Sequence, residues 1–140
     1  MKGRPSAYLL SFPHSQTPMK PIYMTLAISV TGLIIYLSSV PGLTIIGNNS
    51  TADQVVSNLA HIPAYALLTY LWIMTFCPGR FFKNEVIAYL ILIGLVLFSI
   101  SDEIHQSFVP GRTASAIDVG LDLLGISAGY LYFKLTRKAY

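Results

Sequence analysis

A polar stretch between two apolar segments carries most of the residue types in this chain that could do chemistry. Its chemically capable side chains lie within residues 101–122: Asp102, Glu103, His105, Gln106, Arg112, Asp118 and Asp122. Ionisable groups in or beside a hydrocarbon phase are costly, so they persist mainly where they pair, face a bundle interior or bind a polar substrate. We therefore expect the function of the protein to reside in this stretch.

Recognition of a polar head group is the chemistry that these side chains suit best. The planar guanidinium of Arg112 can bind phosphate or carboxylate bidentately, while carboxylates and the Gln106 amide suit hydroxyl, amide or amine groups. We expect an outward-facing pocket for a polar lipid or a lipid-linked cell-wall precursor. Its predicted binding residues are Asp102, Glu103, Gln106, Arg112, Asp118, Asp122, His61 and Tyr65.

Two other uses of the same residues stay open. In a catalytic alternative, Glu103 or Asp102 acts as a general base with His61 or His105 as its proton partner, giving a membrane-embedded hydrolase or transferase for a lipid head group. The chain has no nucleophile elbow, phosphate loop or HExxH pattern, so the reaction class is undefined. In a structural alternative, Arg112 neutralises one or two carboxylates and Gln106 and His61 satisfy the rest, which locks the helix ends together. Four acids against one arginine would still leave surplus negative charge.

Neither a cofactor nor a metal ion is predicted. The acids and His105 include ligand types for a divalent cation, but their spacing is not diagnostic. The lack of an inverted repeat, and polar groups at one side of the membrane, argue against a secondary transporter. The formal net charge of +3 matters for the placement of loops and does not indicate nucleic acid binding.

Composition and hydropathy define the elements that must position these side chains. Of the 140 residues, 54% are hydrophobic and 11% are charged, against roughly 25% charged in soluble domains. Four apolar runs approach the length of roughly 20 residues that crosses a bilayer, at residues 22–39, 55–77, 86–101 and 114–133. The third reaches that length only by including residues 102–106. The sequence predicts an all-α integral membrane bundle of four transmembrane helices over residues 21–140, after a flexible tail over residues 1–20.

Short connections set the predicted topology. Each contains a Pro-Gly pair, at Pro41-Gly42, Pro78-Gly79 and Pro110-Gly111. Such pairs end a helix and reverse the chain, so the bundle should run up-down-up-down. With the helices in this order, all lysines and arginines except Arg112 lie beside helix ends on the same side of the membrane. The positive-inside rule therefore places both termini in the cytoplasm and loops 40–54 and 106–114 outside the cell membrane.

Helix geometry is expected to bring the polar side chains to a similar depth in the membrane. The second helix places His61 about 9 Å below its outer end, and the fourth places Asp118 about 6 Å and Asp122 about 12 Å below its start. The third delivers its acids at its outer end. Asp118 and Asp122 share a helix face, as do His61 and Tyr65. Pro63 removes a backbone donor and should kink the second helix beside the pocket.

A pair of glycines marks a packing face in the last apolar run. Gly125 and Gly129 form a GxxxG step, with which two helices can approach each other closely. We expect this helix to pack tightly on a neighbour, with a homodimer through the same face as a further option.

Over residues 101–129 the chain resembles the VanZ-like membrane protein family. The family's motif residues are met by Asp102, Glu103, Gln106, Phe108, Pro110, Gly111, Arg112, Asp118 and Gly125. A second family pattern, Lys-x-x-His-x-x-x-Tyr, is matched by His61 and Tyr65, with Asn58 in place of the lysine. The resemblance extends from about residue 53 onward. Because the named member of the family is associated with low-level resistance to the glycopeptide teicoplanin, the resemblance implies an effect on envelope properties or glycopeptide susceptibility.

Overall fold

The computed structural model describes residues 21–41, 51–77, 85–112 and 115–138, and all regular secondary structure in these ranges is helical. The helices are α1 (Pro21–Ser39), α2 (Thr51–Phe76), α3 (Glu85–Gln106) and α4 (Ala116–Lys138). Each contains a segment long and apolar enough to cross a membrane. The predicted all-α architecture, with four helices long and apolar enough to span a membrane, is therefore confirmed for the described ranges. The up-down order and the location of the termini stay predictions.

The helix boundaries differ from those that hydropathy predicts. α2 begins four residues before residue 55, and α4 begins two residues after residue 114 and ends five residues after residue 133. The early start of α2 and the late end of α4 arise because hydropathy marks the segment that enters hydrocarbon, whereas backbone hydrogen bonding continues into the polar flanks. The late start of α4 follows from its cap at Ser115. The predicted turns at Pro41-Gly42 and Pro78-Gly79 lie partly or wholly outside the described residues. The predicted tail over residues 1–20 also lies outside them.

The turn after α3 determines where Arg112 lies. Val109 N donates a hydrogen bond to Gln106 O at 3.0 Å, and Arg112 N donates to Val109 O at 3.1 Å. Gly111 has a φ of 78°, in the left-handed region that glycine adopts without steric cost. Pro110 and Gly111 therefore form the predicted turn, which returns Arg112 toward the end of α3.

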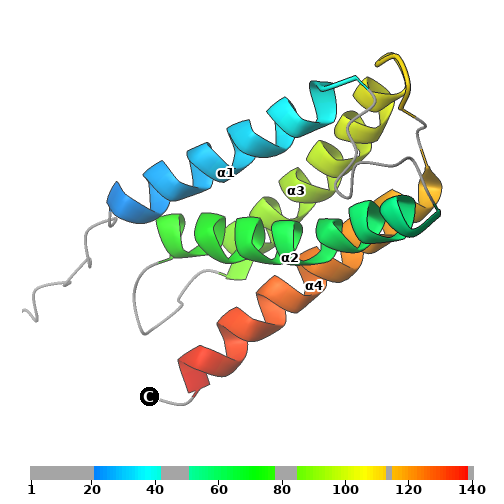
Figure 1. Ribbon diagram of the computed structural model, residues 1–140. Helices are drawn as coiled ribbons and strands as arrows, with labels where there is room; N and C mark the ends of the chain where they lie inside the picture. Colours follow the sequence, from blue (N-terminus) through cyan, green and yellow to red (C-terminus); the bar gives the residue numbers. More distant parts are fainter. Residues whose placement is uncertain (1–20, 42–50, 78–84, 113–114, 139–140) are drawn as a thin grey trace, which may run out of the picture.

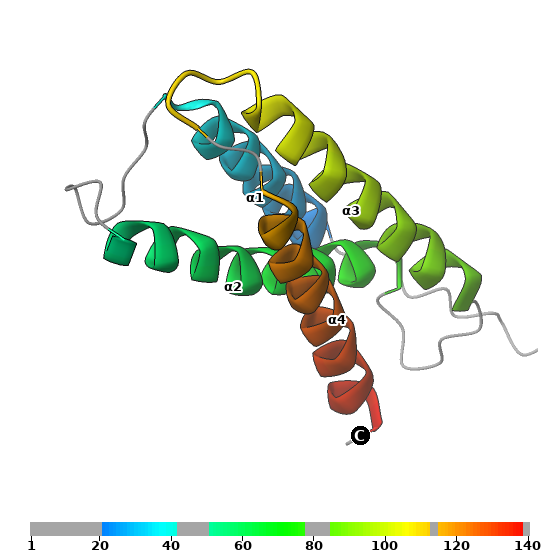
Figure 2. The ribbon, with the colours of Figure 1, turned by 90° about the vertical axis from the view of Figure 1, so that its right-hand side faces the viewer.

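Helices α2 and α4 cross obliquely and make the closest helix contact in the bundle (Figure 1, Figure 2). Gly125 and Gly129 lie at this crossing, where a Cβ atom on either one would collide with the backbone carbonyl oxygen of Ile62 or Ala66. The predicted close packing is confirmed, with α2 as the neighbour. The homodimer through the glycine face stays a prediction, although α2 occupies that face within one chain.

The apolar core lies between α2, α3 and α4. One buried cluster consists of Tyr65, Leu68, Leu95 and Ile126, and a second consists of Ile73, Cys77 and Phe133. Helix α1 is more peripheral, with only 11% of its spanning segment buried. Its exposed side chains are mostly apolar, as expected for a helix that faces lipid. Pro63 lies inside α2 and does not end it.

Candidate functional site

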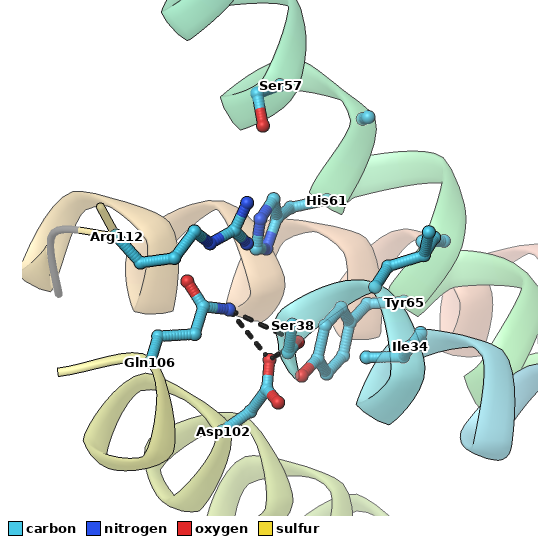
Figure 3. A pocket seen from close by; sticks show the side chains of 11 residues that line it. Ile34, Ser38, Ser57, His61, Tyr65, Asp102, Gln106 and Arg112 are labelled. Carbon is cyan, nitrogen blue, oxygen red and sulfur yellow. Dashed lines mark hydrogen bonds between the residues drawn. The ribbon is translucent and has the colours of Figure 1, made fainter. Parts of the chain in front are cut away.

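Polar side chains from all four helices gather where the C-terminal ends of α1 and α3 meet the N-terminal halves of α2 and α4. The first group surrounds Asp102 on α3 (Figure 3). Ser38 Oγ on α1 donates to Asp102 Oδ2 at 2.7 Å, and Gln106 Nε2 donates to the same oxygen at 3.0 Å. Gln106 Nε2 also donates to Ser38 Oγ at 3.3 Å. This buried network ties the loosely packed α1 to α3.

The second group surrounds Asp122 on α4, which is 1% exposed. Ser99 Oγ on α3 donates to Asp122 Oδ2 at 2.6 Å. His61 Nδ1 on α2 lies 2.8 Å from Asp122 Oδ1, close enough for a hydrogen bond and an ion pair. Asp122 therefore joins α2, α3 and α4, and it fixes the orientation of the His61 ring.

The third group joins the end of α3 to the start of α4. Ser115 N donates to Glu103 Oε2 at 2.6 Å, and Ser115 Oγ accepts from Ile117 N at 3.1 Å as a helix cap. A carboxylate here is favoured by the partial positive charge of the α4 N-terminus. Glu103 Oε1 and Asp118 Oδ1 are buried with no hydrogen-bond partner in the described part of the chain. The carboxylates of this group therefore have only part of their hydrogen-bonding capacity satisfied by the described residues.

A cavity of about 110 Å³ opens beside these groups, and we call it the polar cavity. Its polar lining comes from α1, α2, α3 and the turn after α3: Ser38, Ser57, His61, Tyr65, Asp102, Gln106 and Arg112. Apolar residues of α1 and α2 complete the wall, including Ile34 and Leu37. Figure 3 shows these labelled side chains converging from different helices.

Arg112 lines the polar cavity and forms no salt bridge with an acid in the described part of the chain. Across the described ranges, the pair of His61 and Asp122 is the one salt bridge, and the Arg112 side chain makes no hydrogen bond. The Asp102 and Glu103 carboxylates are instead held by neutral donors, namely hydroxyl, amide and backbone N–H groups. Of the structural alternative, the parts given to Gln106 and His61 are present, as hydrogen bonds to Asp102 and Asp122. The part given to Arg112 is not seen as a salt bridge in the described ranges.

Tyr65 places a second unpaired polar group at the cavity. The residue is 1% exposed, and its hydroxyl has no hydrogen-bond partner among the described residues. Figure 3 shows this hydroxyl directed toward Asp102 and Ser38. The Tyr65 ring is nearly parallel to the His61 ring, with the centroids 6.4 Å apart. The tyrosine is thus buried beside His61 with its polar end at the cavity.

The structure separates the eight predicted binding residues into two sets. His61, Tyr65, Asp102, Gln106 and Arg112 line the polar cavity. The remaining three, Glu103, Asp118 and Asp122, are buried but do not line it. His105 is exposed and hydrogen-bonds through Nε2 to Ser39 Oγ at 3.0 Å. In the described part of the chain, no three His, Cys, Asp or Glu side chains are arranged to hold a metal ion.

Sequence reasoning missed the serines of the site. Ser38 and Ser57 line the cavity, and Ser99 and Ser115 hold buried carboxylates. Ser57 lies four residues before His61 and therefore shares its helix face, which is a usable sequence signal. Ser38 offers no comparable signal, because its role depends on the rotation of α1 against α3.

Comparisons with known proteins give a family and no individual relative. No curated protein and no solved structure matches the chain. A family model described as VanZ/LLP1 matches residues 6–137, which include α1, α2, α3, all but the last residue of α4, and every residue of the polar cavity. With the four membrane-spanning helices described above, this match shows that the chain belongs to the VanZ/LLP1 family.

Proposed function

We propose that this VanZ-family membrane protein uses its polar cavity to bind the anionic head group of a polar lipid or a lipid-linked cell-wall precursor. The observation that carries the proposal is the Arg112 side chain, which lines the cavity with no ion pair among the described residues. An arginine in such surroundings is suited to a phosphate, because its guanidinium presents two parallel N–H donors.

The other lining groups complement an anion that also carries hydroxyl groups. The Ser57 and Tyr65 hydroxyls can donate to phosphate or accept from a ligand hydroxyl. Asp102 receives its described hydrogen bonds at Oδ2, so Oδ1 is the oxygen placed to accept from a ligand. A phosphate with neighbouring hydroxyl or amide groups is the chemistry common to anionic phospholipids and lipid-linked cell-wall precursors.

The size of the cavity favours a compact head group. A single water molecule needs roughly 10–15 Å³ of such space, so about 110 Å³ accommodates a group of several heavy atoms. Pockets for drug-sized ligands are usually larger, at about 300–1,000 Å³. The cavity therefore suits a phosphate with its nearest substituent. A bulky saccharide or peptide attached to that phosphate would extend outside.

The surroundings of the cavity suit a ligand that remains in the bilayer. Phe108, in the turn between α3 and Arg112, is 79% exposed and suited to contact with acyl chains. By the distribution of basic residues, the cavity would face the outer leaflet of the cell membrane. An effect on teicoplanin susceptibility would follow if the bound lipid is a cell-wall precursor.

Replacing Arg112 by alanine tests this proposal. Purified full-length protein in detergent is titrated with fluorescent dioleoyl phosphatidylglycerol, with undecaprenyl phosphate and with neutral dioleoyl phosphatidylcholine. A hydrogen bond to a charged group contributes about 1.5–3 kcal/mol, so Arg112→Ala should weaken binding of the preferred anionic lipid roughly tenfold or more. The two anionic probes distinguish a phospholipid from a cell-wall precursor as the source of the phosphate.

Lys134→Ala is the matched control for this titration. Lys134 is an exposed cation on α4 that lies over the Tyr130 ring, 4.9 Å from its centroid, and it does not line the polar cavity. Lys134→Ala changes the net charge by the same amount as Arg112→Ala, and it should leave lipid binding unchanged. Equal binding by wild type and Arg112→Ala, with thermal unfolding also unchanged, would contradict the proposal.

A second candidate function is a hydrolase or transferase acting on the bound head group. The arrangement of His61 favours it, because Asp122 holds Nδ1 and leaves Nε2 without a hydrogen bond to any described residue. A carboxylate that orients an imidazole in this way is a common feature of general bases. Glu103 and Asp102 already accept hydrogen bonds from Ser115 and Ser38, which favours His61 over them as the base.

Turnover of radiolabelled lipid by the purified protein tests this second candidate. If the protein is an enzyme, product should form with wild type and fall at least about a hundredfold in His61→Gln, as expected for loss of a general base. Absence of product from both anionic lipids with wild-type protein would contradict the enzymatic candidate and leave the binding proposal standing.

A further inference from the structure

An apolar groove lies beside the polar cavity, within the helix bundle. It has a volume of about 270 Å³ and is lined by side chains of α1, α2 and α3, among them Thr31, Leu68, Trp72, Gly94 and Phe98. The Trp72 Nε1 group donates to Thr31 Oγ1 at 3.3 Å, so these polar groups satisfy each other across helices α1 and α2. The remaining lining is hydrocarbon, and we call this space the apolar groove.

The apolar groove continues the polar cavity along the same helices. Each of α1, α2 and α3 contributes to both spaces from positions three or four residues apart. The pairs, with the cavity residue first, are Ile34 and Thr31, Ala64 and Leu68, and Asp102 and Phe98. Residues at this spacing lie on one helix face, about 5 Å apart along the axis. The two spaces are therefore stacked one helical turn apart on a single three-helix face.

The aromatic rings of Tyr65 and Phe98 mark the junction between the two spaces. Tyr65 lines the polar cavity, Phe98 lines the apolar groove, and their ring centroids are 6.2 Å apart. On α3 the groove runs from Phe98 back to Ile91, a distance of about 10 Å. That length is shorter than the hydrocarbon thickness of one leaflet, which is half of a core of about 30 Å.

Gly94 keeps part of the groove open. A Cβ atom built at this position would meet no other atom within 4 Å, although Gly94 lies inside α3 and lines the groove. A side chain added at Gly94 would therefore occupy the groove without colliding with a helix backbone. This makes the position suitable for a variant that fills the groove and leaves the polar cavity intact.

We propose that the apolar groove binds the hydrocarbon chain of the same lipid whose head group occupies the polar cavity. This inference rests on the proposed function, and it adds that the ligand is recognised as an intact lipid. Because hydrocarbon is also the surrounding solvent, the groove contributes by shape and packing more than by the hydrophobic effect. Free phosphate esters with the same head group are then weak ligands.

Filling the groove tests this inference. Full-length Gly94→Leu, with Gly94→Ala as a smaller step, is titrated in detergent with dioleoyl phosphatidylglycerol and with glycerophosphoglycerol, its chain-free head group. Gly94→Leu should weaken binding of dioleoyl phosphatidylglycerol roughly tenfold, with Gly94→Ala intermediate. Glycerophosphoglycerol should bind wild type and both variants equally weakly. Gly32→Leu is the matched control, because Gly32 is exposed on α1, has open space around it and lines neither space.

The outcomes separate this inference from the proposed function. Unchanged lipid binding in Gly94→Leu would overturn the inference, as would equal weakening of both probes or equal weakening by Gly32→Leu. Tight binding of glycerophosphoglycerol to wild type, lost in Arg112→Ala, would also overturn it but would support head-group binding. Unchanged binding of dioleoyl phosphatidylglycerol in Arg112→Ala would overturn the proposed function itself. Thermal unfolding of each variant confirms that the comparison is made between folded proteins.

Discussion

The Tyr65 hydroxyl lies buried at the polar cavity without a hydrogen-bond partner in the described part of the chain. A buried polar group left unsatisfied costs about 1–3 kcal/mol, so its removal should not destabilise the fold. Tyr65→Phe is therefore expected to retain or raise the thermal unfolding temperature while weakening head-group binding several-fold. Both quantities are measured on one preparation, with Tyr36→Phe as a control because Tyr36 is 66% exposed on α1.

The opposite pattern for Tyr65→Phe would count against ligand binding. A lower unfolding temperature with unchanged lipid binding would mean that the hydroxyl supports packing through contacts within the protein. Equal effects of Tyr65→Phe and Tyr36→Phe on binding would mean that the assay detects the loss of any hydroxyl group. Either result would contradict the assignment of Tyr65 to the binding site.

The sequence identified the charged members of the site but not their partners. Asp102 and Asp122 could be singled out because ionisable groups in an apolar helix are rare. The hydroxyls that hold them, Ser38 and Ser99, could not be singled out, because serine is common in membrane helices and only tertiary packing assigns it a partner. For the same reason, the sequence could not tell whether Arg112 pairs with an acid or remains available.

At the scale of elements, the crossing of α2 and α4 holds His61 beside Asp122. Gly129→Leu would drive a side chain into the Ala66 carbonyl at this crossing. Overpacking of a close contact typically costs about 1–3 kcal/mol, so the variant should unfold at a clearly lower temperature. Gly120→Leu, on the same helix with open space around the glycine, should unfold like wild type. Equal stability of the two variants would contradict the packing seen at the crossing.

The helices themselves could be predicted because each follows from local composition. An apolar run of spanning length must form a helix in hydrocarbon, where backbone groups have no other partner. The turn at Pro110 and Gly111 also follows from the local sequence, and the structure contains it as predicted. Helix α2 begins four residues before its apolar run and α4 ends five residues after its run, since helical hydrogen bonding continues past the apolar segment. Helix α4 begins two residues late, because Ser115 caps it. Which face each helix turns inward depends on its neighbours and was not available from the sequence.

At the scale of the whole molecule, polarity is concentrated inside one end of an apolar bundle. The outward faces of the described helices are largely apolar, whereas the four acids at this end, Asp102, Glu103, Asp118 and Asp122, are buried between helices. The polar cavity opens at this end, and the apolar groove continues from it toward the middle of the bundle. This arrangement matches an amphipathic ligand, with a polar head and a hydrocarbon chain, better than it matches a soluble metabolite.

Photo-crosslinking of a lipid head group tests the central claim most directly. The full-length protein in membranes is exposed to phosphatidylglycerol or undecaprenyl phosphate carrying a diazirine beside the phosphate, and the labelled residues are mapped by mass spectrometry. Head-group binding in the polar cavity predicts labels concentrated on its lining, such as Ser57, Ala60 and Ala64, and lost in Arg112→Ala. Labels spread evenly over exposed lipid-facing residues such as Ile28 and Leu97, and unaffected by Arg112→Ala, would contradict it.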